Sequence, residues 1–411
     1  MGNTLLNLFG ELEDIKLASL YTRMGIPEAE ISEAFCITES MLVRSFLGKG
    51  NPGKRIHAAE DNEPNPEKSK ENGLVRFMRV HRWTVFFWLQ NLVWKLGRWK
   101  SENLEKFVKD YNPDLILTVF QNAGYLNKLT LHVLSLTKAK LVLCAWDNNY
   151  SMKQWFHSPL RWIKHFCDRI PMRKVVQKAI LFYVISDIQK KEYEKCFKMH
   201  CKILTKGADF TELPGFKKEY NNPMQIVYTG NIALNRWKSL KLIADALESI
   251  NRDGVKAQLR IYTATPLTNK MEKALNRGES SFLMGSVPAC EIPEVQKNAD
   301  MLVHVEAMDL ANKLRVRQSF STKIVDYLKA ARPILAVGPR EVASIDHLIR
   351  YDCAIVSDNK TELEQKLCSI LENPSELNRV AANAYECGRK YHNKENIQRM
   401  LLQDLKAVCE K

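Results

Sequence analysis

The sequence has no hydrophobic run long enough to cross a membrane. Its most apolar stretch, TVFFWLQNLVWKLG at 84–97, contains Gln90, Asn91 and Lys95, and it falls short of the roughly 20 apolar residues that a spanning helix needs. No signal peptide is recognisable at the start, because residues 1–21 have the pattern of an amphipathic helix with its acids on one side. These absences predict a cytoplasmic protein that crosses no bilayer.

Metal-binding and disulfide patterns are missing as well. The ten cysteines are scattered without a CxxC pair or a Cys/His spacing typical of zinc, and Cys144 and Cys353 fall in apolar runs. Such usage is typical of a reduced, intracellular chain. We predict no metal site and no bound cofactor.

Acidic residues are the scarcer of the two charges. Lys and Arg number 61 whereas Asp and Glu number 47, which leaves a formal net charge of +14. This excess favours a polyanionic partner: nucleic acid, an acidic membrane surface or a phosphorylated ligand. With 411 residues, the chain is also long enough for two domains.

Near-continuous apolar runs, each followed by a helical pattern, alternate along most of the chain. Such runs are typical of parallel strands that are buried on both faces of a sheet. We predict strands at 114–120, 140–146, 181–186 and 202–207, and then at 225–230, 258–264, 301–306, 333–338 and 354–358. The fold class is therefore α/β, with two Rossmann-like, doubly wound domains facing each other across a cleft.

A polar seam, ELPGFKKEYNNP at 212–223, divides the two sets of strands. We place a first domain at 1–215, a linker at 216–223, a second domain at 224–392 and a C-terminal helix at 393–411. Residues 48–73 have almost no apolar content and are expected to form a long mobile loop. Because the first domain begins at a helix, we expect it to lack its first strand, or the sequence to start late.

A short unit, SFSTKIVDYLKAARPILAVG at 319–338, places polar groups around the start of a helix. A helix N-terminus carries unpaired N–H groups and a partial positive charge, so it can bind phosphate. Ser319, Ser321 and Thr322 add hydroxyl groups, Lys323 adds a charge, and Asp326 could accept hydrogen bonds from a ribose diol. The alternative is an ordinary N-cap followed by a helix with one exposed acid.

A second unit, YTGNIALNRWKSLKLIADAL at 228–247, has the pattern of a strand, a glycine turn and a helix. Gly230 permits a close approach of the backbone to a ligand. Arg236 and Lys238 stand at the start of the helix, where they could neutralise a diphosphate or remain solvated surface charges. Two such turns at the carboxyl ends of strands lie where ligands of doubly wound sheets bind.

These motifs and the order of elements resemble the retaining GT-B glycosyltransferases of family 4. That group has a strand-Gly-Arg turn followed by a lysine, and an acidic motif, E-x7-E, that leads into a helix. QSFSTKIVD at 318–326 stands where the group has EGFGLPLLE, which puts Gln318 on the first glutamate and Asp326 on the second. In the glycine turn, Asn231 stands where the group has arginine and Arg236 where it has the lysine. The altered residues indicate a divergent subgroup.

The resemblance implies the GT-B architecture and a glycosyltransferase of the hexosyltransferase type. The enzyme would move a sugar from a nucleotide-sugar donor to a glycan or lipid-linked acceptor, with retention and without a metal, in cell-surface polysaccharide synthesis. Arg236 and Lys323 would stabilise the departing diphosphate. Asp147 would orient a sugar or acceptor hydroxyl, or else cap the next helix. The residues expected to bind the donor are Gly230, Asn231, Gln318, Ser319, Ser321, Thr322 and Asp326.

Two basic segments rich in aromatic residues, 76–110 and 151–180, belong to the first domain. Cations interleaved with Trp and Phe suit an anionic membrane surface, and we expect Arg76, Arg79 and Arg82 to contribute to binding. The alternative is a core face of aromatic residues with a solvated basic rim. No nucleic-acid motif accompanies the charge, so we expect no nucleic-acid partner. The predicted location is the inner face of the cell membrane.

Two other functions remain open on the sequence. A nucleotide-sugar epimerase shares the GT-B frame, but it would need acid/base groups in the cleft, and Gln318 in place of a glutamate argues against them. A non-catalytic, GT-B-shaped binding protein would explain both the altered motif and the missing first strand.

Overall fold

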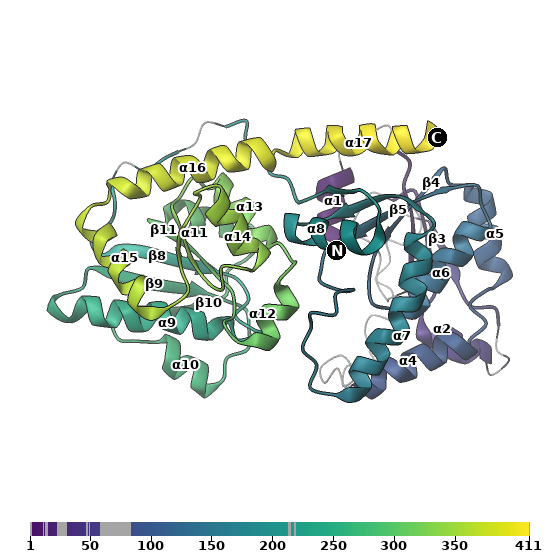
Figure 1. Ribbon diagram of the computed structural model, residues 1–411, viewed down its shortest axis with the longest axis horizontal. Helices are drawn as coiled ribbons and strands as arrows, with labels where there is room; N and C mark the ends of the chain where they lie inside the picture. Colours follow the sequence, from purple (N-terminus) through teal and green to yellow (C-terminus); the bar gives the residue numbers. More distant parts are fainter. Residues whose placement is uncertain are drawn as a thin grey trace.

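The computed structural model describes residues 2–10, 12, 15–22, 31–46, 48, 50–57, 84–212, 215–217 and 219–410. They form two α/β halves that lie side by side, and helices α16 (Ser375–Tyr391) and α17 (Lys394–Glu410) run along one side of both (Figure 1). We refer to residues 2–212 as the first half and to residues 219–391 as the second half.

The second half is built on one six-stranded sheet in which every neighbouring pair is parallel. In spatial order its strands are β10 (Ser281–Gly285), β9 (Ala257–Tyr262), β8 (Met224–Thr229), β11 (Met301–Val305), β12 (Ile334–Val337) and β13 (Ile355–Ser357). Five of these strands were predicted from their apolar runs. The sequence analysis missed β10, an edge strand whose last residues are exposed.

Helices cover both faces of this sheet, so that its central strands are fully buried. The helices are α9 (Arg236–Ile250), α10 (Asn269–Leu275), α11 (Ile292–Asn298), α12 (Leu310–Val316), α13 (Thr322–Lys329), α14 (Ala343–Arg350) and α15 (Lys360–Glu372), with a 3-10 turn at Asn251–Asp253. One apolar core joins the sheet to α9 and α15, and a second joins it to α13, α14 and α16. Because helices pack on both faces of the sheet, both sides of each central strand are buried, which explains the continuous apolar runs in the sequence.

The first half contains a four-stranded parallel sheet at the predicted positions. Its strands follow the order β4 (Leu115–Val119), β5 (Lys140–Ala145), β6 (Ala179–Val184) and β7 (Cys201–Ile203). The accompanying helices are α5 (Glu102–Tyr111), α6 (Gly124–Ser135), α7 (Pro159–Val176) and α8 (Asp187–Phe197). Ser186 caps α8, because its hydroxyl accepts a hydrogen bond from the N–H of Gln189.

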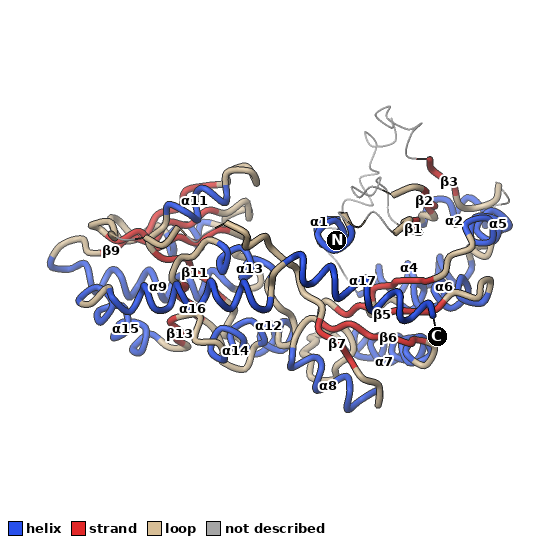
Figure 2. The backbone as a smooth tube through the Cα atoms, turned by 90° about the horizontal axis from the view of Figure 1, so that it is seen from above, coloured by secondary structure: helices blue, strands red, loops and turns tan. Residues whose placement is uncertain are grey.

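The N-terminal region differs from the single helix expected over residues 1–21. Helix α1 ends at Phe9, and β1 (Ala18–Tyr21) pairs in parallel with β2 (Glu33–Cys36). Strand β3 (Lys54–His57) lies within the predicted loop 48–73 and pairs with β2 in antiparallel fashion, while residues 58–73 lie outside the described ranges. The first half therefore has strands ahead of residue 114, in a three-stranded sheet that lies apart from β5–β7 (Figure 2).

Local contacts explain why so polar a segment forms β3. The guanidinium of Arg55 lies 2.5 Å from Oε2 of Glu33 on the neighbouring strand. At Gly53, where φ is +105°, a Cβ would overlap the ring of Phe35, so the close approach of this turn requires glycine. Helices α2 (Glu39–Phe46) and α4 (Thr84–Leu96) complete this region.

Helix α17 closes the apolar core of the first half, although it follows the second half in sequence. Leu401 and Leu405 are buried in one cluster with Leu8, Val142 and Tyr183. Polar contacts anchor the same helix, because Asp404 accepts hydrogen bonds from the hydroxyl of Tyr183 at 2.9 Å and from Lys202 at 2.5 Å. Of the helices within the described ranges, none is both long and apolar enough to cross a membrane.

Candidate functional site

The candidate site lies where the two halves meet, at the carboxyl ends of their parallel strands. The loops after β5 and β6 contact residues 314–319 of the second half. The amide of Asn148 donates to the carbonyl of Leu314 at 2.9 Å, and the hydroxyl of Ser186 donates to the carbonyl of Gln318 at 2.7 Å. Ligands of doubly wound sheets bind at this end of the strands.

Lys323 reaches from the first turn of α13 to the end of β8. Its Nζ lies 3.1 Å from the carbonyl oxygen of Thr229 and 4.6 Å from the centre of the Tyr228 ring. At Gly230, where φ is +142°, a Cβ would collide with this Nζ, so only glycine leaves room for the lysine. Burial, aided by the charge of Arg236, lowers the pKa of Lys323 to about 8.

Arg236, the first residue of α9, is paired with a buried carboxylate. Glu306 follows β11 and is 3% exposed, and its two oxygens accept hydrogen bonds from Nε and Nη2 of Arg236 at 3.0 and 3.2 Å. Burial raises the pKa of Glu306 against the opposing effect of Arg236, and burial holds the pKa of His304 well below its usual range. Arg236 thus lies where the sequence predicted, but with a counter-charge that the sequence prediction did not include.

The predicted hydroxyl groups gather at the start of α13. The hydroxyl of Ser319 donates to Oδ1 of Asp147 in the first half at 3.1 Å. Ser321 is the N-cap residue of α13, yet its hydroxyl makes no capping hydrogen bond, and its N–H donates to Ser344. Thr322 is exposed. The Ser319 hydroxyl thus binds the other half, and the Ser321 hydroxyl does not cap α13.

Gln318 is fully buried, and its side chain turns toward the first half. Its Nε2 donates to Oε2 of Glu192 on α8 at 2.5 Å, and Arg317 holds the same carboxylate through two bonds of 2.6 and 2.7 Å. Burial opposes ionisation of Glu192, but Arg317, Lys153 and Gln318 outweigh it and hold its pKa below the usual range. Within the described part of the chain, Oε1 of Gln318 has no hydrogen-bond partner.

Asp326, the acid expected to hold a ribose, also joins the two halves. Its Oδ1 lies 2.5 Å from Nζ of Lys206, which follows β7, and its side chain is 41% exposed. Asp147 is exposed and does not cap a helix, since the next helix begins at Pro159. Asn231 is exposed too, and its Oδ1 accepts from the N–H of Ala233 within its own turn.

Comparison with known proteins identifies the architecture. No protein-family model matches the sequence, and no curated protein matches it. Among solved structures, Anabaena HepE in complex with UDP aligns with a TM-score of 0.58 and 14% identity over 76% of this chain and 84% of its own. Sucrose-phosphate synthase from Thermosynechococcus elongatus aligns with a TM-score of 0.54 and 14% identity, over 75% of this chain and 78% of its own.

The pneumococcal O-GlcNAc transferase GtfA, in complex with UDP and GlcNAc, aligns with a TM-score of 0.52 and 13% identity. The alignment covers 75% of this chain and 60% of GtfA, so the chain spans less than two thirds of that protein. All three neighbours are GT-B glycosyltransferases. The chain has the GT-B fold. At 13–14% identity, structural similarity establishes the fold alone, so the activity has to be argued from the residues of the site.

Sequence reasoning missed three charged residues that pair with predicted site residues or lie beside them. Glu306 and Lys206 stand just after β11 and just after β7, and the rule that ligands bind at carboxyl ends of strands would have found them. Glu192 lies within α8, in a run of lysines and glutamates that is typical of a solvated helix, so no local signal distinguishes it.

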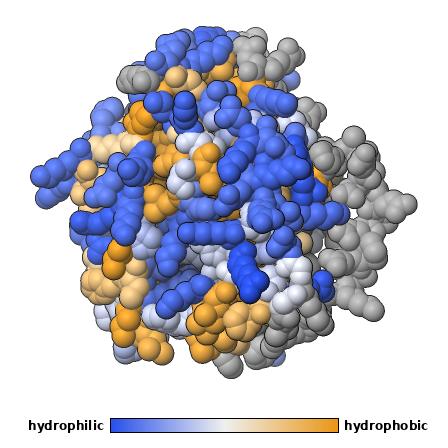
Figure 3. Space-filling view, turned by 90° about the vertical axis from the view of Figure 1, so that its right-hand side faces the viewer, coloured by the Kyte–Doolittle hydropathy of each residue, from blue (hydrophilic) through white to orange (hydrophobic). Residues whose placement is uncertain are grey.

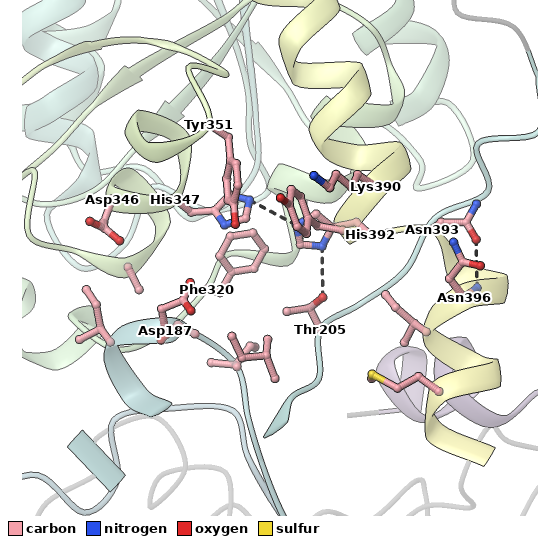
Figure 4. A pocket seen from close by; sticks show the side chains of 18 residues that line it. Asp187, Thr205, Phe320, Asp346, His347, Tyr351, Lys390, His392, Asn393 and Asn396 are labelled. Carbon is pink, nitrogen blue, oxygen red and sulfur yellow. Dashed lines mark hydrogen bonds between the residues drawn. The ribbon is translucent and has the colours of Figure 1, made fainter. Parts of the chain in front are cut away.

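A second space between the halves lies behind residues 318–321, and none of the predicted site residues lines it. This cavity of about 370 Å³ is bounded by α14, the ends of β6 and β7, and the junction of α16 with α17. His347 points toward His392, which in turn contacts the hydroxyl of Thr205 at 3.1 Å (Figure 4). Phe320 packs on both histidines, with its ring centre 5.0 Å from that of His347 and 5.4 Å from that of His392.

Proposed function

We propose that the protein is a glycosyltransferase that moves a sugar from a nucleotide-sugar donor to an acceptor. The observation that carries the proposal is the cluster of Lys323, Arg236 and Gly230 beside the start of α13. Cations and helix N–H groups at the carboxyl end of a parallel strand fit a diphosphate. HepE and GtfA, which share this fold, were solved with UDP bound.

The charges of the cluster suit the leaving group of such a transfer. Glu306 offsets the charge of Arg236. Among the residues that the structure describes, no carboxylate pairs with Lys323, so Lys323 supplies the cation that is left uncompensated. A diphosphate bound there would stabilise the ammonium form of Lys323 and raise its pKa again. As the sugar–phosphate bond breaks, the diphosphate gains charge, and Lys323 stabilises that charge more strongly in the transition state than in the ground state. This supports a transfer that needs no metal.

The finer features of the proposal come from the resemblance to family 4. They are transfer of a hexose with retention, a glycan or lipid-linked acceptor, and a role in cell-surface polysaccharide synthesis at the inner face of the membrane. Asp147 supports an acceptor on the side of the first half, because its carboxylate is exposed and is held by Ser319 at the junction.

The contacts of two acids, Glu192 and Glu306, favour transfer over epimerisation. Glu192 is held by Arg317 and Gln318, and Glu306 is held by Arg236. Because an acid/base catalyst must exchange protons with its substrate, carboxylates engaged in this way are poor candidates. A non-catalytic binding protein would retain the diphosphate site and would lack turnover.

One experiment separates the three functions. The purified chain is mixed with a panel of nucleotide sugars, with and without lipid-linked acceptor, and thermal unfolding and released nucleoside diphosphate are both measured. We expect one donor to raise the melting temperature and to release nucleoside diphosphate faster when acceptor is present. Conversion of the donor sugar without release would indicate an epimerase. Stabilisation with neither product would indicate a binding protein.

A further inference from the structure

Helix α7 of the first half has its polar and apolar faces reversed over residues 159–170, whereas its last turns bury Met172, Val175 and Val176 in the usual way. On its inner face, Lys164 contacts Asp168 in a buried ion pair, and His165 is 2% exposed. On its outer face, four large apolar residues are each more than half exposed: Leu160, Ile163, Phe166 and Ile170. A helix that packs on a core normally has the opposite arrangement.

Lys164, His165 and Asp168 on the inner face of α7 each have a partner, so the reversal is a defined arrangement. Asp168 lies against Gly124 at the start of α6, where a carboxylate is favoured by the helix dipole. Nδ1 of His165 lies 2.9 Å from the amide of Asn122. With the inner face committed to these contacts, the apolar stripe on the outer face needs a partner outside the described chain.

A second stripe lies on α4, which packs against α7. Its residues are 46% to 52% exposed and recur at helical spacing: Val85, Leu89, Leu92 and Leu96. Helix α2, which packs on α4, adds Val43 and Phe46. These helices lie at the lower side of the first half in Figure 1, and apolar residues gather along the lower edge of the end view in Figure 3.

The charges around the stripes are of one sign. Exposed cations on the three helices and the turn after α4 are Arg44, Lys95, Arg98, Lys100, Arg161, Arg173 and Lys174. The acids of the three helices are Glu39, which accepts hydrogen bonds from Gln90 and Trp94, and the buried Asp168. An apolar stripe with a cationic margin and no exposed acid is the pattern of a helix that lies in an anionic membrane interface.

We propose that the outer faces of α4 and α7 dock on an anionic membrane, with the apolar stripes entering the boundary between headgroups and acyl chains. A second copy of the chain fits less well, because it would bring the same cations against each other. The loop that contains Asp147 and Trp155 leads from the junction to α7, and the Trp155 side chain on it is 52% exposed. Docking by this face therefore sets the acceptor side of the site near the lipid.

Helices α4 and α7 lie within the two segments that the sequence indicated, 76–110 and 151–180, but the residues that form the surface differ from those expected. Arg76, Arg79 and Arg82 lie outside the described residues, and Trp94, one of the aromatic residues expected at the membrane, is buried in the core of the first half. The proposal shifts the contact mainly to exposed aliphatic residues, which the sequence analysis did not single out. It rests on the proposed function only for the lipid-linked acceptor, since binding to lipid requires no catalysis.

The test is co-sedimentation of the chain with vesicles of phosphatidylcholine containing about one-third phosphatidylglycerol. The variant Ile163→Glu/Ile170→Glu is compared with Met284→Glu/Ile349→Glu, which adds the same charge at exposed apolar sites of the second half. We expect about a tenfold or greater loss of vesicle binding in the first variant only. Leu89→Glu/Leu92→Glu should repeat the loss if the first variant does not fold.

Three outcomes would overturn the proposal: wild-type protein that ignores these vesicles, equal binding by both double variants, or a wild-type dimer that becomes monomeric on the α7 substitutions. The last would assign the face to a second copy. Release of nucleoside diphosphate from the donor is measured separately on the same protein preparations before vesicles are added. This measurement shows whether the proposed transferase activity stands, independently of membrane binding.

Discussion

The second half of the molecule is one six-stranded parallel sheet, whereas the described first half is divided between a four-stranded parallel sheet and a three-stranded mixed one. Strands β11 and β12 are buried at every residue, while every residue of β1 and β4 is only half-buried. The regular half carries the proposed donor site. The irregular half carries the apolar surface and the proposed acceptor side, so the part that would meet the acceptor departs furthest from a single parallel sheet.

The sharpest test of this division is Lys323→Ala. We expect the rate of nucleoside diphosphate release to fall by about 10²–10³-fold, as for loss of one preorganised charge on a leaving group. The control is Lys329→Ala, which removes an exposed lysine from the last turn of the same helix. Equal rates in the two variants would move the leaving-group site away from the second half.

A smaller effect is expected for Asp326→Ala, which should weaken donor binding by about 10- to 100-fold through loss of charged hydrogen bonds worth about 1.5–3 kcal/mol. Titration calorimetry with the donor measures it. Lys206→Ala removes the partner of Asp326 from the other half. If both variants weaken binding equally, Asp326 acts by joining the halves and has no contact with the ribose.

The contact between the halves can be measured directly with Glu192 and Arg317. A double-mutant cycle of Glu192→Ala and Arg317→Ala in urea unfolding should give a coupling free energy of about 1–2 kcal/mol, because the pair is bidentate and Arg317 is 11% exposed. Arg379 and Glu376, an exposed pair within α16, provide the control cycle and should couple by less than about 0.5 kcal/mol.

The last test concerns the pH dependence of stability. Burial, with a contribution from His392, lowers the pKa of His347 to about 3, and burial lowers the pKa of His392 to about 4. Unfolded histidine titrates near 6.5, so between about pH 6.5 and 4 the unfolded chain takes up protons that the native chain does not. The free energy of unfolding should therefore fall as the pH falls, by about 1.4 kcal/mol per pH unit for each fully titrating histidine.

Urea titrations at successive pH values test this. His392→Asn should flatten the acid-side slope, and His200→Asn, which changes an exposed histidine, is the control. A slope that is unchanged by His392→Asn would mean that this histidine is protonated in the native protein.

All nine predicted strands are confirmed, because a strand buried on both faces requires a continuous apolar run that is visible without tertiary information. The strands that were missed are short or half-buried, and β3 depends on the pairing of Arg55 with Glu33, residues 22 positions apart. Among the residues predicted for the site, Asp147, Gln318, Ser319 and Asp326 contact the opposite half, whereas Arg236 and Lys323 have their partners within the second half. Their partners were not predictable in the same way, since Glu192 lies 125 residues from Arg317 and Lys206 lies 120 residues from Asp326.

The chain passes between the halves twice, and the two passages are joined. Ala208 and Asn393 form a β-bridge, with hydrogen bonds from Ala208 to His392 at 2.8 Å and from Lys394 to Ala208 at 2.9 Å. At Gly207 a Cβ would press on the backbone of Lys394. We expect two crossings held at one point to act as a single pivot, about which the halves rotate without sliding past each other. Opening the junction to the proposed donor would then be one angular motion. A disulfide across the pivot should leave that motion free, whereas one between α8 and residues 317–319 should abolish it.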